Sequence, residues 1–373
     1  MNKNTKLRLG VVAATAAAVL AIGAAAPAYA DPSGFKPING AGSDTTQDVL
    51  NGVATVVTDI GSYDATGSAK IQTKSGGPLF TRPNGSTDGQ IALSASINSG
   101  GGHTWPTSGG VDITGQLDFA RSSSGPSSSF VGTDLTFIPF AKDAVTYAVS
   151  AASDFPRDIS LGASSQDAIS PAPFTLRNIY RGTVSTYVDS NFEPVTIRPI
   201  IPQEGSGTRS FWLSAIGMTE TTIVGTPTTD IGNSAQEHTG TYIKNPGDIA
   251  PFSVASYIAQ GNHGALPAAA PVTERRGNIE LGNIDSTKPL LFTTGGGVEL
   301  NTAFPVNRLV FNVVQTTRLT GSGTNDALLQ ATFAGSGSTV CAATTQIKQY
   351  GFGTIGTLCG NTTNYKQALR YVK

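Results

Sequence analysis

The stretch that most constrains the fold is Val195–Trp212, which has the pattern of a strand, a glycine turn and a helix. Residues 195–201 are apolar and rich in β-branched side chains, as is typical of a strand. The chain then turns at Gly205 and Gly207, and apolar residues follow at helical spacing. Because serine is a preferred N-cap residue, the pattern predicts a helix that begins directly after Ser206.

A turn of this kind presents free backbone N–H groups and the positive end of a helix dipole at one place. Ser206, Gly207, Thr208 and Arg209 form the turn, and two hydroxyls and a guanidinium can join the backbone donors there. This arrangement suits a small oxyanion held without a metal. It is also an ordinary way to leave a strand and cap a helix, so it predicts half of a ligand site only if a second such turn exists.

A second turn of the same type lies near the start of the chain, in residues 40–46, with the sequence GAGSDTT. It follows a short apolar segment and precedes an amphipathic helix, expected over residues 49–60. Ser43 and Thr45 bring hydroxyls to this turn. Asp44 either caps the helix or faces the site, where it would repel a dianion unless one of the two carries a proton.

Two further segments offer candidate ligand-binding residues. Arg121, at the end of a predicted strand, is followed by Ser122 and Ser123, a grouping that suits an oxyanion and equally suits a polar surface loop. His238 is placed at the site as a hypothesis, although a lone histidine is more often a hydrogen-bonded loop residue.

Residues 1–30 have the pattern of a Sec-type signal peptide: a basic start, an alanine-rich apolar run, and small residues before Asp31. No cysteine stands at the cleavage point, so we expect no lipid anchor and a protein that is secreted. The sequence has no second long apolar run, so we expect no membrane-spanning segment.

Composition excludes several classes of function. Without residues 1–30, which carry three of the 24 Lys and Arg residues, the net charge is −4, and no basic stripe for nucleic acid is present.

Cys341 and Cys359 are close in sequence, and in an exported protein we expect them to form a disulfide. The three histidines are far apart and there is no CxxC motif, so we expect neither a metal nor another cofactor.

In chain order, several segments resemble the phosphate-binding protein of bacterial phosphate ABC transporters and its secreted DING-type relatives. These segments are GAGSDTT at 40–46, LDFARSSS at 117–124, FIPFAKDAVTYAV at 137–149, LRNIYRGTVSTY at 176–187, IIPQEGSGTRSFW at 200–212, and 248–258. The resemblance implies an α/β, two-lobed type II periplasmic-binding-protein fold with the ligand in the cleft between the lobes. It implies that residues 31–139 and 259–373 form one lobe and residues 140–258 the other.

The resemblance also suggests which residues bind the ligand. Ser206, Gly207 and Thr208 match the family's ligand-binding SGT sequence. Ser43 and Thr45 lie in its first binding turn, where Asp44 stands in place of a hydroxyl.

Two of the family's binding residues are replaced in this chain. The family's aspartate falls at Ser123, and its arginine before the SGT sequence falls near Pro202. We expect Arg121 and Arg209, which lie next to matched positions, to restore the positive charge. The ligand is therefore expected to be phosphate or another small polar or anionic solute.

These observations predict a secreted solute-binding protein that captures phosphate or a similar oxyanion when its lobes close. Its partner would be an ABC permease or an extracellular protein. The alternative is an extracellular binding or adhesion module of the same fold with no role in transport. An enzyme is not expected, because the sequence has no GxSxG elbow and no cluster of metal ligands.

Overall fold

The computed structural model describes residues 31–373, so the expected signal peptide lies outside the described residues. The helices are α1 (Gln47–Ala54), α2 (Ser86–Ile97), α3 (Leu176–Arg181), α4 (Gly207–Ala215), α5 (Glu220–Ile223), α6 (Val254–Gly261), α7 (Thr324–Phe333), α8 (Thr339–Ala342) and α9 (Thr344–Gln349). The strands of the main sheet are β1 (Ile38–Gly42), β2 (Ile60–Ser62), β5 (Phe119–Ser122), β6 (Leu135–Ser150), β10 (Arg198–Pro199), β11 (Asp248–Ser253), β12 (Ile279–Leu281), β16 (Asn307–Gln315) and β17 (Lys366–Gln367).

Shorter strands form two-stranded ribbons outside this sheet. They are β3 (Lys70–Ile71) with β4 (Phe80–Thr81), β7 (Asp158–Ile159) with β13 (Asn283–Ile284), β8 (Thr186–Val188) with β9 (Pro194–Thr196), and β14 (Leu290–Phe292) with β15 (Val298–Leu300). The main sheet has the strand order β10-β11-β6-β16-β5-β1-β2, and β12 and β17 also pair with β6. The sheet is mixed: β1 is parallel to β2 and β5, whereas β6 is antiparallel to both β11 and β16.

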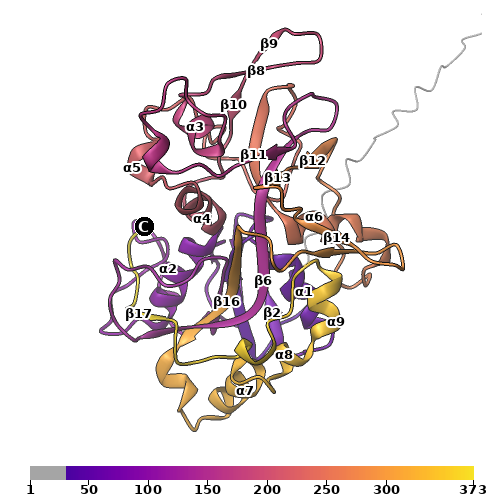
Figure 1. Ribbon diagram of the computed structural model, residues 1–373. Helices are drawn as coiled ribbons and strands as arrows, with labels where there is room; N and C mark the ends of the chain where they lie inside the picture. Colours follow the sequence, from indigo (N-terminus) through magenta and orange to yellow (C-terminus); the bar gives the residue numbers. More distant parts are fainter. Residues whose placement is uncertain (1–30) are drawn as a thin grey trace, which may run out of the picture.

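Strand β6 connects the two halves of the molecule. It is 16 residues long, and its side chains are almost all buried, as expected for a continuous apolar run with packing on both faces. Residues 135–144 of β6 pair with β16, and residues 145–149 pair with β11. In Figure 1 this strand runs from the lower part of the molecule to the upper part.

The mixed α/β, two-lobed form predicted from the sequence is confirmed. The lower lobe in Figure 1 carries α1, α2, α7, α8 and α9, and the upper lobe carries α3, α4 and α5. The limits of the lobes, at residues 139–140 and 258–259, stay a prediction.

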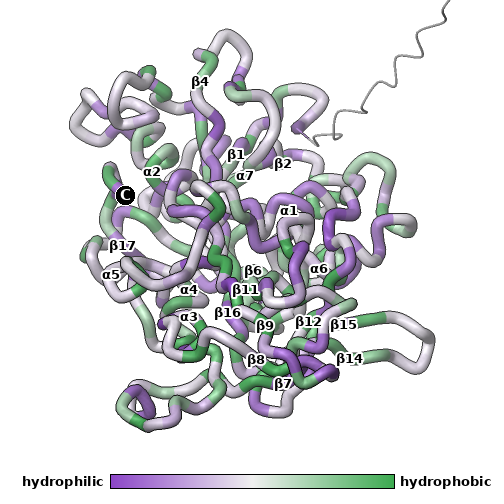
Figure 2. The backbone as a smooth tube through the Cα atoms, turned by 90° about the horizontal axis from the view of Figure 1, so that it is seen from above, coloured by the Kyte–Doolittle hydropathy of each residue, from purple (hydrophilic) through white to green (hydrophobic). Residues whose placement is uncertain are grey.

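The apolar core follows this sheet. Seen from above in Figure 2, hydrophobic stretches of the chain pass through the centre, where β6, β11 and β16 lie. In the upper lobe, the buried rings of Tyr180 and Trp212 pack edge to face with their centroids 5.8 Å apart. Trp212 therefore fixes α4, and with it the glycine turn that precedes α4, against the core.

The structure differs from the sequence-based expectation in three segments. The sequence of residues 94–110, rich in glycine and serine, predicts a flexible segment, yet α2 extends to Ile97. The helix is buried on nearly all sides, so it lacks the amphipathic period that marks a surface helix. Helix α1 ends at Ala54 rather than near residue 60, because Ile60 pairs with Ile38 in the sheet. The sequence also predicts a final short helix over residues 364–371, and this prediction is wrong, because Lys366 and Gln367 pair with β6.

The disulfide between Cys341 and Cys359 is confirmed, and it closes a loop with a sequence separation of 18. Within residues 31–373, no helix combines the length and the apolar character needed to cross a bilayer.

We predict that replacing both cysteines by serine lowers the free energy of unfolding by about 3 kcal/mol, because the unfolded chain gains the conformational freedom of the open loop. Urea denaturation of both proteins measures the difference. A reducing agent should shift the midpoint of the wild type alone. Equal midpoints for the two oxidised proteins would contradict the prediction.

Candidate functional site

The glycine turn of the upper lobe has the predicted geometry. Helix α4 begins at Gly207, and the Ser206 hydroxyl accepts hydrogen bonds from the backbone N–H groups of Thr208 (3.1 Å) and Arg209 (3.2 Å). Gly205 has a φ of +81°, a conformation that glycine adopts readily. A Cβ atom on Gly207 would lie 2.5 Å from the Ser123 hydroxyl, so the close approach of this turn to the lower lobe depends on glycine at that position.

The turn of the lower lobe meets this one directly. The Thr45 hydroxyl lies 3.3 Å from the Thr208 hydroxyl and 3.3 Å from the Ser123 hydroxyl. Thr45 follows β1, Ser123 follows β5, and Thr208 lies in the first turn of α4. The hydroxyl cradle, defined here as Thr45, Ser123, Ser206 and Thr208, is therefore built from both lobes, and each member is at most 2% exposed.

The cradle surrounds a carboxylate that the sequence analysis did not identify. Thr45 and Thr208 donate to Oε1 of Glu237, the latter at 2.8 Å, and Ser206 donates to Oε2 at 3.1 Å. Glu237 is fully buried. The cradle thus holds an oxyanion through hydroxyl donors.

An arginine that the sequence analysis also missed contacts the cradle. Arg308, in β16, donates from Nη2 to the Thr208 hydroxyl at 2.7 Å and to Oδ2 of Asp143 at 2.8 Å. Arg308 and Asp143 are direct cross-strand neighbours on β16 and β6. The guanidinium also lies over the ring of Phe211, 5.4 Å from its centroid.

The two arginines expected from the sequence point elsewhere. Arg121 is fully buried behind the first turn, where it donates to the Ser43 carbonyl at 3.1 Å and to the Tyr63 carbonyl at 2.6 Å. Arg209 forms an ion pair with Glu220 at 2.9 Å. Among the described residues, neither guanidinium forms a hydrogen bond with the cradle: Arg209 reaches it through its backbone N–H, which donates to Ser206, and the guanidinium at the cradle is that of Arg308.

The remaining predicted site residues are near the cradle but not all are part of it. The Ser122 hydroxyl donates to the Ser124 carbonyl at 2.7 Å, and the buried Ser43 hydroxyl has no hydrogen-bond partner among the described residues. Oδ2 of Asp44 lies 3.6 Å from Nδ1 of His238, and both side chains are buried. The predicted pairing of the two turns is therefore present, with Asp44 and His238 behind it.

Burial and nearby charges shift the pKa values of Asp44, Glu237 and His238. Burial and then the charge of Glu237 raise the pKa of Asp44 well above its usual value. Burial opposes ionisation of Glu237, but His238, the Thr45 hydroxyl and Arg308 outweigh it and lower its pKa. Burial and then Arg275 lower the pKa of His238 to about 3. Of the two carboxyl groups, Glu237 is therefore the one that ionises more readily.

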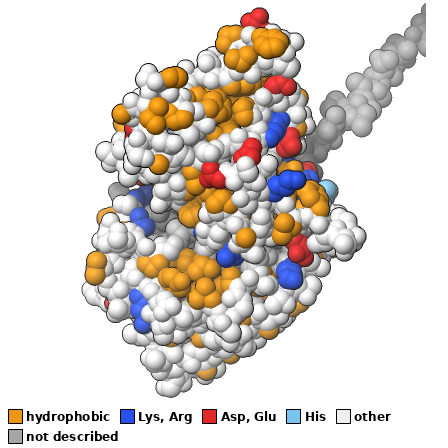
Figure 3. All heavy atoms as spheres, viewed as in Figure 1, with side chains coloured by type: hydrophobic (Ala, Val, Ile, Leu, Met, Phe, Trp, Pro, Cys, Tyr) orange, Lys and Arg blue, Asp and Glu red, His pale blue; other side chains and the backbone are white. Residues whose placement is uncertain are grey.

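A cavity adjoins the cradle. It has a volume of about 650 Å³, and Ser123 and Arg308 belong to both its wall and the cradle region. Its wall also includes Ser210, Phe211 and Phe311. Figure 3 shows the surface hollowed between the two lobes, with basic side chains at the edge. The cavity therefore borders the cradle at Ser123 and Arg308.

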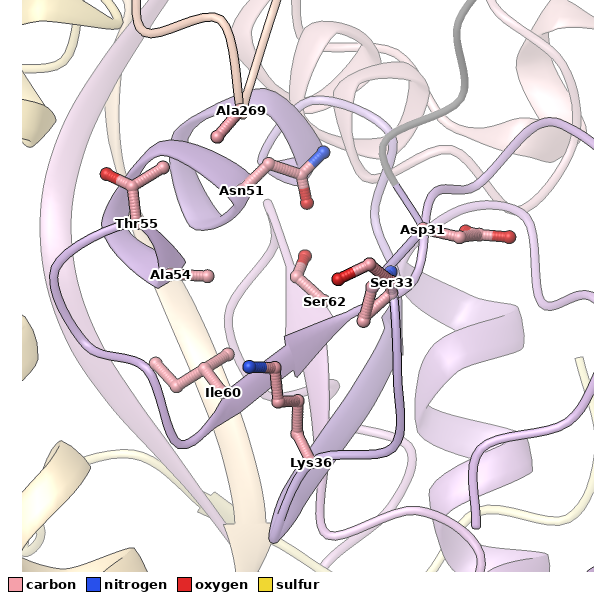
Figure 4. Close-up of a pocket in the computed structure, with 10 residues that line it drawn as sticks. Asp31, Ser33, Lys36, Asn51, Ala54, Thr55, Ile60, Ser62 and Ala269 are labelled. Carbon is pink, nitrogen blue, oxygen red and sulfur yellow. The ribbon is translucent and has the colours of Figure 1, made fainter. Parts of the chain in front are cut away.

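A second cavity, of about 380 Å³, lies between α1 and β2. Figure 4 shows Lys36, Asn51 and Ser62 around it. It contains none of the site residues expected from the sequence. Among residues 31–373, no group of three or more His, Cys, Asp or Glu side chains is placed to hold a metal ion.

The two-lobed fold is the one found in solved structures of phosphate-binding proteins. The chain has 12% sequence identity to a putative phosphate ABC transporter substrate-binding protein with bound phosphate from Clostridium perfringens, with a TM-score of 0.50 over 85% of this chain and 99% of that one. It is equally similar to an ABC-type phosphate transport receptor from Vibrio cholerae, at 12% identity and a TM-score of 0.50 over 85% and 100%.

A DING protein is 15% identical, with a TM-score of 0.50 over 86% of this chain and 91% of that chain. No family model and no curated protein sequence matches the chain. At these identities the likeness establishes the fold alone. The three structures are described as a substrate-binding protein, a transport receptor and a DING protein.

We predict that Arg308→Met lowers the free energy of unfolding by about 3–5 kcal/mol, because it leaves the buried Asp143 carboxylate without its charged partner. Urea denaturation measures the loss. The double variant Asp143→Asn/Arg308→Met should recover much of it, since no unpaired charge remains. A single variant as stable as the wild type would contradict the prediction.

Proposed function

We propose that this protein is a secreted solute-binding protein that binds phosphate or a similar small oxyanion in the hydroxyl cradle between its lobes. One observation carries the proposal: hydroxyls from both lobes converge on a single negatively charged carboxylate group. Donors arranged to hold a buried carboxylate are also suited to the oxygens of a phosphate ion. The N-terminus of α4 and the Arg308 guanidinium add positive potential at the same place.

The solved structures with this fold support the same ligand class, because two of them are described as phosphate transport proteins. Lobe closure is the accompanying motion that we propose, with one lobe formed by residues 31–139 and 259–373 and the other by residues 140–258. The closed cleft then binds and positions the anion, and we propose no catalytic role for the cleft.

We further propose an ABC permease as the partner that receives the solute. Deletion of the coding sequence should then reduce phosphate uptake when external phosphate is scarce. Normal uptake in the deletion strain, with the protein recovered from the medium, would instead favour the extracellular module without a transport role.

Isothermal titration of residues 31–373 with phosphate, arsenate and sulfate tests the proposed ligand. We expect saturable heat with at least one of these anions. The absence of binding to all three, for the wild type and for the variants described below, would exclude the oxyanion proposal.

Two adjacent threonines allow a matched comparison. We predict that Thr45→Val weakens oxyanion binding by about tenfold, because one hydrogen bond to a charged group is worth about 1.5–3 kcal/mol. Thr46→Val is the control: Thr46 is also buried, and its hydroxyl has no hydrogen-bond partner among the described residues. Equal affinities for the two variants would show that the cradle does not bind the anion.

A further inference from the structure

We propose that Glu237 is an internal ligand of the cleft: its carboxylate holds the two lobes together and must leave the cradle before an external oxyanion can enter. This inference rests on the proposed function, because it concerns the same cradle. It assigns to Glu237 a role that differs from ligand binding, namely competition with the ligand.

The contacts of Glu237 are those of a bound anion. Both carboxylate oxygens accept hydrogen bonds from hydroxyl groups, and the donors come from both sides of the cleft. Thr45 belongs to the lower lobe, whereas Ser206 and Thr208 belong to α4 in the upper lobe. Glu237 therefore makes the bridge that a solute makes when it closes a two-lobed protein.

The backbone of Glu237 is anchored in the upper half of the molecule. Its carbonyl oxygen accepts a hydrogen bond from the Ser253 N–H, at the end of β11, at 2.9 Å. Among the side-chain hydrogen bonds of Glu237, the contact with Thr45 is consequently the one that crosses the cleft. Rotation of the side chain, or separation of the lobes, breaks this contact without disturbing β11.

The cradle cannot hold the carboxylate and an external oxyanion together. The hydroxyls of Thr45, Ser206 and Thr208 already donate to Glu237, and a second anion beside an ionised carboxylate costs several kcal/mol. Nη1 of the buried Arg308, in contrast, has no partner among the described residues. It remains available to an anion that arrives through the adjoining cavity.

Competition of this kind lowers the apparent affinity. If only a fraction of the molecules has an empty cradle, the measured dissociation constant equals the intrinsic one divided by that fraction. Removing the carboxylate should therefore tighten binding of the external anion, whereas removing an ordinary binding residue would weaken it. The direction of the change separates the two roles.

Phosphate titrations of Glu237→Ala and Glu237→Gln test the inference, with calorimetry as the readout. We expect the dissociation constant for phosphate to fall at least about tenfold in Glu237→Ala. Glu237→Gln removes the charge with little change in size, and it should move the constant in the same direction. Glu204→Ala, which alters an exposed glutamate beside the same turn, is the control and should bind phosphate as the wild type does.

Small-angle X-ray scattering gives a second readout that does not depend on affinity. Without phosphate, the wild type should be compact, and Glu237→Ala should have a larger radius of gyration because its cross-cleft contact is lost. Phosphate should restore the compact form of the variant. Circular dichroism establishes that each variant is folded before these measurements are compared.

The outcomes separate this inference from the proposed function. If the wild type binds phosphate and both Glu237 variants bind it equally or more weakly, the proposed function stands and the internal-ligand inference is wrong. If no protein binds phosphate, the proposed function is wrong. In that case a ligand-free Glu237→Ala variant as compact as the wild type would also overturn the inference, whereas an expanded variant would support the carboxylate as the closing contact.

Discussion

A fully buried carboxylate must be satisfied by donors, and this requirement organises the cleft. Glu237 is ionised, and hydroxyl groups from distant parts of the chain supply its hydrogen bonds. Thr45 is available because it stands in a turn between β1 and α1, and Thr208 because α4 begins immediately before it. The local rules of helix capping thus create the donors, and the sheet brings them to one place.

The sheet also brings the second charge pair of the cleft into position. Asp143 and Arg308 face each other on β6 and β16, next to the place where the partner of β6 changes from β16 to β11. Asp143 accepts further hydrogen bonds from the Ser253 hydroxyl (3.0 Å) and the Ala255 N–H (3.1 Å). One buried ion pair therefore connects β6 with both β11 and β16 and directs the Arg308 guanidinium to Thr208.

The parts of the site that depend on local sequence could be predicted, and the parts that depend on sheet register could not. The cap at Ser206 and the first turn around Thr45 follow from glycine, hydroxyl residues and helical spacing, and the structure confirms the helix start after Ser206. Glu237 lies in an irregular segment with no pattern that predicts its direction. Arg308 carried one usable signal, a charged residue within an apolar strand, and Asp143 carried the same signal, but only the register shows that they are neighbours.

The distribution of charge explains why an external anion would replace the Glu237 carboxylate in the cradle rather than bind beside it. Asp143 is paired with Arg308, and burial raises the pKa of Asp44 whereas the surroundings of Glu237 lower its pKa, so Glu237 carries the negative charge at the centre of the cradle. Hydroxyl groups and the N-terminus of α4 stabilise that charge, and the nearby Arg308 adds positive potential. Donors of this type suffice for one anionic group. An external anion that replaces the carboxylate meets the same donors, whereas one that joins it meets uncompensated repulsion in a buried site.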